Sequence, residues 1–141
     1  MTIGPETLLV HLRIVGVLMA LLVIVNLLVP GHLRWREELA RLSLVNRQIV
    51  QVHSIFIVLV LALLSALLLT SAEALLEPTA LSRAVLIGLT LFWTLRMLMQ
   101  WFFYSSEIWR ADRFRTLVHY VFSGIWVYVA LVFALTLGST R

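Results

Sequence analysis

The chain contains no cysteine and no lysine, and charged residues make up only 13% of its 141 residues. The lack of cysteine excludes disulfides, thiolate metal sites, iron–sulfur clusters and CxxC redox chemistry. The scarcity of charge excludes an ordinary water-facing surface, because soluble domains carry about 25% charged residues. With 62% hydrophobic residues, the composition instead predicts a lipid-embedded protein.

Four long apolar runs make up most of the chain. They cover residues 7–29, 47–70, 80–103 and 115–137. Each run is long enough to cross roughly 30 Å of hydrocarbon at about 1.5 Å per residue. The sequence therefore predicts an all-α membrane protein in which residues 1–141 form a single antiparallel four-helix transmembrane bundle.

Residues at the ends of the runs agree with this division. Pro5 suits a first helical turn, and Pro30 terminates the first run. Thr79 is expected to cap the N-terminus of the third helix, and Asp112 that of the fourth.

Arginine is distributed unevenly over the connecting segments. Seven arginines lie in or beside the first and third loops: Arg34, Arg36, Arg41, Arg47, Arg110, Arg113 and Arg115. The other side has only Arg83 and Arg141. Because positive charge marks cytoplasmic loops, loops 1 and 3 are predicted to be cytoplasmic and both termini outside, in a bacterial inner membrane. The arginines flank apolar runs and form no stripe, so nucleic acid is not an expected partner.

The first loop, "GHLRWREELARLSLV", has a helical pattern of its own. Trp35, Leu39 and Leu42 fall at i, i+4 and i+7, with charged residues between them. This pattern predicts a short interfacial helix on the cytoplasmic surface, continuing into the second span. The alternative is a solvated connector.

Five polar residues within or near the spans fall at one depth. They are Asn26, His53, Arg96, Gln100 and His119. At about 1.5 Å rise per residue, all lie roughly 6–12 Å from the membrane midplane, on the predicted cytoplasmic side. Because polar groups inside a membrane usually face the bundle interior, these residues are the candidate site. Helical spacing places Arg96, Gln100, Phe103 and Glu107 on one face, and His119, Ser123 and Trp126 on another.

The two histidines predict a specific cofactor. His53 and His119 could clamp haem b as axial ligands to its iron, with Arg96 pairing with a propionate and with Gln100 and Asn26 lining the site. The alternatives are another bound metal or cofactor, or two separate histidines that close contacts between helices, with no cofactor. In outline the pattern resembles small four-helix cytochrome-b-like membrane proteins, a likeness of architecture that gives no function.

Other residues leave alternatives open. Arg96 could instead pair with Glu107 or a partner subunit, or extend to the interface. The aromatic cluster around the third loop suits an interfacial belt or a quinone pocket. For His11 the nearest expected partners are Ser65 and Thr70. The small residues Gly16, Ala20, Ala62 and Ala66 would permit close helix approach, within the bundle or between copies.

These observations favour a small integral membrane protein with a cytoplasmic-side polar site. The predicted function is electron transfer through haem b, linked to a quinone. The expected partners are the lipid bilayer, a quinone or redox subunit, and further subunits in a homo- or hetero-oligomer. The alternative from another class is a non-enzymatic structural or accessory subunit of a membrane complex.

Overall fold

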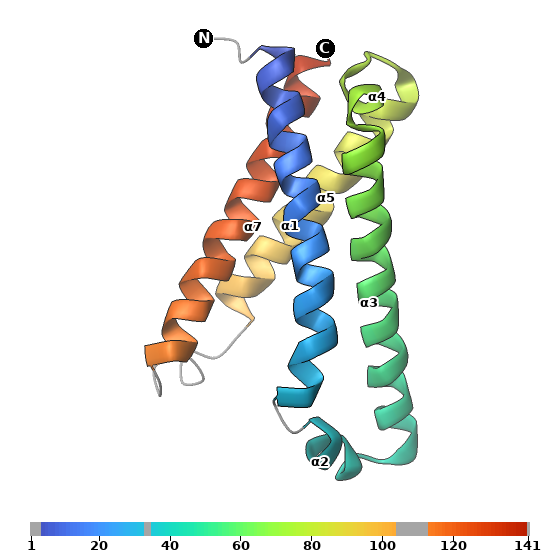
Figure 1. The fold of residues 1–141 in the computed structure, drawn as a ribbon, viewed down its shortest axis with the longest axis vertical. Coiled ribbons are helices and arrows are strands. Elements are labelled where there is room, and N and C mark those ends of the chain that lie inside the picture. Colours follow the sequence, from blue (N-terminus) through green and yellow to red (C-terminus); the bar gives the residue numbers. More distant parts are fainter. Residues whose placement is uncertain (1–3, 33–34, 104–112, 141) are drawn as a thin grey trace. The chain divides into compact units, whose positions relative to one another are not determined.

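The computed structural model describes residues 4–32, 35–103 and 113–140, and every element in this part of the chain is a helix. The four long helices are α1 (Pro5–His32), α3 (Leu44–Thr70), α5 (Ala80–Phe102) and α7 (Arg113–Ser139). Two short helices, α2 (Trp35–Ala40) and α4 (Ala72–Leu76), follow α1 and α3 (Figure 1). Each long helix contains a segment long and apolar enough to cross a membrane. The predicted all-helical class is confirmed, and the chain is a small multi-pass integral membrane protein.

The start of α5 shows how the sequence sets a helix end. Thr79 Oγ1 accepts a hydrogen bond from the Ser82 backbone N–H at 3.1 Å, and Ser82 Oγ accepts one from the Thr79 N–H at 3.2 Å. This reciprocal capping box satisfies two N–H groups that have no partner inside the helix. The predicted cap at Thr79 is confirmed, whereas Asp112 lies outside the described residues.

The first loop contains the predicted short helix, α2, but its continuation into the second span is wrong. The helix ends at Ala40, and a turn separates it from α3. Ser43 then caps α3, with its Oγ accepting a hydrogen bond from the Asn46 N–H at 3.4 Å. A serine is a good N-cap because its side chain competes with helical backbone bonding, so the chain starts a new helix here.

The chain divides into two compact units, one formed by Arg13–Ala72 and the other by Met1–Leu12 with Glu73–Arg141. In the first unit, Ser65 Oγ on α3 donates to the Gly16 carbonyl on α1 at 2.8 Å. A Cβ at Gly16 would lie 3.0 Å from Leu69 Cγ and 3.1 Å from Leu68 Cβ. Gly16 therefore permits the predicted close approach within this unit, whereas Ala62 and Ala66 are exposed.

In the second unit, α5 packs against α7. Contacts pair the end of α5 with the start of α7, and earlier residues of α5 with later ones of α7, so the two helices are antiparallel. The buried face of α5 includes Leu86, Trp93 and Gln100, which are spaced by seven residues. Two helical turns separate such residues, so they share a face. This pairing positions the candidate site.

Candidate functional site

The polar residues of the third span lie on one face of α5. Trp93, Arg96 and Gln100 occupy positions i, i+3 and i+7, which project from the same side of a helix. The exposed fractions of Trp93 and Gln100 are 2% and 4%, and Arg96 is half-buried. This face of α5 is therefore buried against other parts of the protein. We call the residues that meet here the α5–α7 seam: Thr90, Trp93, Arg96, Gln100, His119, Ser123 and Trp126.

Gln100 connects Arg96 to His119 across the seam. Arg96 Nη1 donates to Gln100 Oε1 at 3.2 Å, and Gln100 Nε2 lies 2.9 Å from Nδ1 of His119. Three of the five residues predicted to form one polar layer are thus hydrogen-bonded in a chain. Arg96 is engaged by its own helix pair, and Glu107, another predicted partner of Arg96, lies outside the described residues.

Because one end of this series of hydrogen bonds is an arginine, the donor and the acceptor in each bond can be assigned. A guanidinium only donates, so the Gln100 oxygen faces Arg96 and the Gln100 NH₂ group faces His119. Nδ1 of His119 then accepts, which places the proton of the neutral ring on Nε2. An axial haem ligand needs an unprotonated nitrogen, so iron ligation through Nε2 requires Gln100 to release Nδ1. Haem ligation by His119 stays a prediction, with this added requirement.

Arg96 also lies over an aromatic stack. Its Cζ is 4.8 Å from the centroid of the Trp126 ring, inside the cation–π range of about 6 Å. Trp126 stacks on Trp93 with ring centroids 5.2 Å apart and planes inclined by 21°. Phe122 packs beside Trp126 at 5.8 Å. The electron-rich ring face offsets part of the cost of removing the guanidinium from water.

Four buried polar atoms of the seam have no hydrogen-bond partner among the described residues. They are Thr90 Oγ1, Trp93 Nε1, Ser123 Oγ and Trp126 Nε1. Leaving a buried donor unsatisfied costs about 1–3 kcal/mol, and native proteins keep few such groups without a reason. The indole N–H groups can only donate, so this part of the seam suits a molecule that brings hydrogen-bond acceptors.

The other two predicted site residues, Asn26 and His53, belong to the unit formed by Arg13–Ala72. Both are exposed, and both side chains bond to their own helix one turn earlier. Asn26 Nδ2 donates to the Leu22 carbonyl at 2.8 Å, and His53 Nδ1 lies 2.8 Å from the Ile49 carbonyl. Because His53 and His119 belong to different units, these contacts leave their pairing as haem ligands a prediction.

His11 has a partner that sequence reasoning missed. Its Nδ1 lies 2.8 Å from the Tyr128 hydroxyl of α7, and the two rings meet edge to face at 5.9 Å. The expected partners were wrong, because Ser65 bonds to Gly16 and Thr70 Oγ1 donates to the Ala66 carbonyl. A second hydrogen bond thus joins helices within the unit that contains the seam.

The predicted polar face of α5 ends earlier than expected. Phe103 forms the C-cap of α5, and its exposed fraction is 77%. Phe103 therefore does not share the environment of Gln100. The neighbouring aromatic residues Trp101, Phe102 and Phe114 are exposed as well, and Tyr104 and Trp109 lie outside the described residues.

The tryptophan stack was also missed, although a signal for it was present. Trp93 precedes Arg96 by three residues, and Trp126 follows His119 by seven, so each indole shares a face with a predicted site residue. Trp126 was placed on the His119 face, but no role was assigned to Trp93.

Comparison of the chain with protein-family models, with curated proteins and with solved structures gives no match. The functional argument therefore rests on the geometry of the seam in a small integral membrane protein.

Proposed function

We propose that the α5–α7 seam binds the ring of a membrane quinone. The observation that carries the proposal is the pair of buried indole N–H groups of Trp93 and Trp126, which have no acceptor among the described residues. The carbonyl oxygens of a quinone are acceptors, and its flat ring suits aromatic side chains. Ligand sites commonly combine such an apolar, aromatic lining with a few placed polar groups.

The polar atoms around the two indoles support the same class of ligand. Arg96 has donors only, and the hydrogen bond from Gln100 makes Nε2 of His119 a donor. The hydroxyl groups of Thr90 and Ser123 can each donate as well. A seam in which donors predominate favours a carbonyl-bearing head over a cation or a ligand that itself must donate.

The lipid-facing side of α5 supports access from the bilayer. Phe92 and Leu95, beside Trp93 and Arg96 in the chain, have exposed fractions of 53% and 48%. The Phe92 ring meets Trp93 edge to face at 5.3 Å. An isoprenoid tail would lie along such apolar side chains while the ring enters the seam, because the hydrophobic effect keeps the tail in lipid.

Electron exchange with haem b extends this proposal. In this extension His53 and His119 ligate the iron and Arg96 pairs with a propionate, and the haem supplies one-electron chemistry when bound. The extension needs the two units to bring both histidines to one haem, and it needs His119 to present an unprotonated nitrogen. A visible spectrum of purified protein from haem-supplied cells tests it directly.

A second candidate is a structural or accessory subunit. The interhelical bond between Gln100 and His119 and the contact of Arg96 with Trp126 favour it. Such contacts hold membrane helices together at about 0.6–2 kcal/mol each. In this candidate the polar residues of the seam act on each other, and no ligand enters.

Tryptophan fluorescence separates the two candidates. Replacing Trp35, Trp101 and Trp109 with phenylalanine leaves Trp93 and Trp126 as the only indoles. This variant, in nanodiscs, is titrated with a short-tailed benzoquinone. We expect quenching that saturates, with the apparent affinity about tenfold weaker in Arg96→Leu, as loss of one charge-assisted hydrogen bond predicts.

Arg83→Leu is the matched control. Arg83 is an exposed arginine on the same helix, thirteen residues before Arg96, so its loss changes the charge of α5 equally. We expect it to leave the affinity unchanged. Quenching that rises linearly with quinone and is equal in all variants would refute the quinone proposal and leave the structural candidate.

A further inference from the structure

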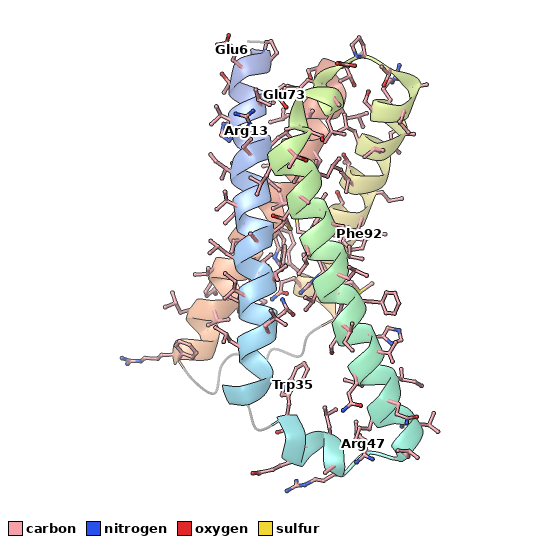
Figure 2. All side chains as sticks on the ribbon, turned by 45° about the vertical axis from the view of Figure 1, so that its right-hand side comes forward. Glu6, Arg13, Trp35, Arg47, Glu73 and Phe92 are labelled. Atoms are coloured by element: carbon pink, nitrogen blue, oxygen red, sulfur yellow. The ribbon has the colours of Figure 1, made fainter. Side chains whose placement is uncertain are left out.

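A polar hollow lies where α2 meets α3, within the unit formed by Arg13–Ala72. It has a volume of about 390 Å³, and its lining residues are Leu39, Leu44, Arg47, Gln48 and Gln51. Figure 2 labels Arg47 in the first turn of α3, close to the turn that joins α3 to α2. The size falls within the range of about 300–1,000 Å³ that is usual for small-ligand pockets.

The lining of the hollow is suited to an anion. It contains one guanidinium and two amide side chains, and none of its lining residues is acidic. The acidic residues of α2, Glu37 and Glu38, are not among the lining residues. Arg47 also lies in the first turn of a 27-residue helix, whose N-terminus carries a partial positive charge. A guanidinium with amide donors beside it matches the oxygen atoms of a phosphate group.

The lining of the hollow also has an apolar part. It includes Leu39 and Leu44, and the exposed fraction of Leu44 is 59%. Aliphatic side chains next to a cation suit a ligand that is charged at one end and hydrocarbon at the other. In a chain with four membrane-spanning helices, the ligand of this description that surrounds the protein is a phospholipid.

We infer that the hollow binds the phosphodiester of an anionic phospholipid. Arg47 donates to the phosphate oxygens, and Gln48 and Gln51 donate to the remaining oxygens of the phosphate or glycerol. The acyl chains lie against Leu39 and Leu44. This lipid site is separate from the quinone proposal, because no residue of the α5–α7 seam lines it.

Native mass spectrometry of the purified full chain tests the lipid site. The protein in neutral detergent is titrated with phosphatidylglycerol, and the lipid-bound fraction is measured for wild type, Arg47→Gln and Arg41→Gln. Arg41 is an exposed arginine close in sequence that does not line the hollow. We expect Arg47→Gln to weaken the first binding event about tenfold and Arg41→Gln to leave it within about twofold, as one charge-assisted hydrogen bond predicts. Gln51→Leu should weaken it as well, by a smaller factor.

Inorganic phosphate distinguishes a lipid from a free anion. We expect phosphate at millimolar concentration to displace little of the bound lipid, because it lacks the acyl chains. Displacement by phosphate as efficient as that by unlabelled lipid would overturn the lipid assignment. Equal losses in Arg47→Gln and Arg41→Gln would overturn the hollow as a site, because they would indicate attraction to surface charge in general.

Discussion

Replacing Gly16 with alanine would place one methyl group against the neighbouring helix. Its Cβ would meet Leu69 Cγ and Cδ2 at 3.0 Å and Leu68 Cβ at 3.1 Å. The Leu69 side chain can rotate away, but Leu68 Cβ is fixed to the α3 backbone, so the helices must separate slightly. Overpacking of this kind costs about 1–3 kcal/mol, against a gain of about 1 kcal/mol in helix propensity. We therefore expect a net loss in the free energy of unfolding of up to about 2 kcal/mol.

The hydrogen bond between the two helices adds to this loss. Ser65 Oγ donates to the carbonyl of Gly16 itself, so separation of α1 and α3 lengthens that bond. Interhelical hydrogen bonds in membranes contribute about 0.6 kcal/mol on average. The double variant Gly16→Ala, Ser65→Ala should consequently lose less than the sum of the two single variants, since both act on one contact.

Gly88 and Gly124 provide matched controls. Each lies within a long helix, and a Cβ at either position would meet nothing within 4 Å. Alanine there should leave stability unchanged or raise it by up to about 1 kcal/mol through helix propensity alone. The assay is reversible unfolding in mixed micelles by titration with SDS, followed by tryptophan fluorescence. A Gly16→Ala protein as stable as Gly88→Ala would refute the close-packing argument.

Three further predictions follow from the sequence and the helix contacts. Because the chain has no cysteine, the single variants Leu42→Cys and Glu77→Cys report on which side of the membrane loops 1 and 2 lie. An impermeant maleimide should label Glu77→Cys in intact cells but Leu42→Cys only after permeabilisation. The reverse labelling pattern would invert the predicted orientation. Thr79→Ala should lower the free energy of unfolding by about 1 kcal/mol in the same SDS titration, because it removes the α5 cap; an unchanged value would mean that the cap contributes nothing. If haem b is bound, His119→Ala should abolish or shift the Soret band of the purified protein, and a colourless, fully folded wild type would remove the haem prediction.

Run length was enough to locate the four long helices. The predicted end of the first at Pro30 is wrong, because α1 continues through Pro30 to His32. A span must be long, apolar and internally hydrogen-bonded. The third predicted run, 80–103, therefore differs from the observed helix α5, Ala80–Phe102, by a single residue. The N-cap at Thr79 was predicted correctly because capping depends only on residues that are close together in the sequence. The separation of α2 from α3 was missed, because the apolar spacing of Trp35, Leu39 and Leu42 runs up to Ser43 without showing a break, whereas Ser43 begins α3 as its N-cap.

The hydrogen-bond partners of the polar side chains were less predictable from the sequence. Helical spacing correctly grouped Arg96 with Gln100 and His119 with Trp126, because spacing fixes a face. It could not show whether a side chain reaches a neighbouring helix or turns back to its own backbone. His53 bonds to the Ile49 carbonyl one turn earlier, an option open to any donor in a helix. Tyr128 is 117 residues from His11, beyond any local pattern.

The contact between His11 and Tyr128 has a consequence for the order of assembly. His11 belongs to α1, and Tyr128 belongs to α7, which is translated later. The hydrogen bond therefore cannot form until α7 has been translated and inserted, whereas the contacts of Gly16 with α3 need only the first half of the chain. A nascent chain released before Tyr128 would contain the α1–α3 pair complete but leave His11 without its ring partner. Two parts of α1 only five residues apart are thus completed at different times.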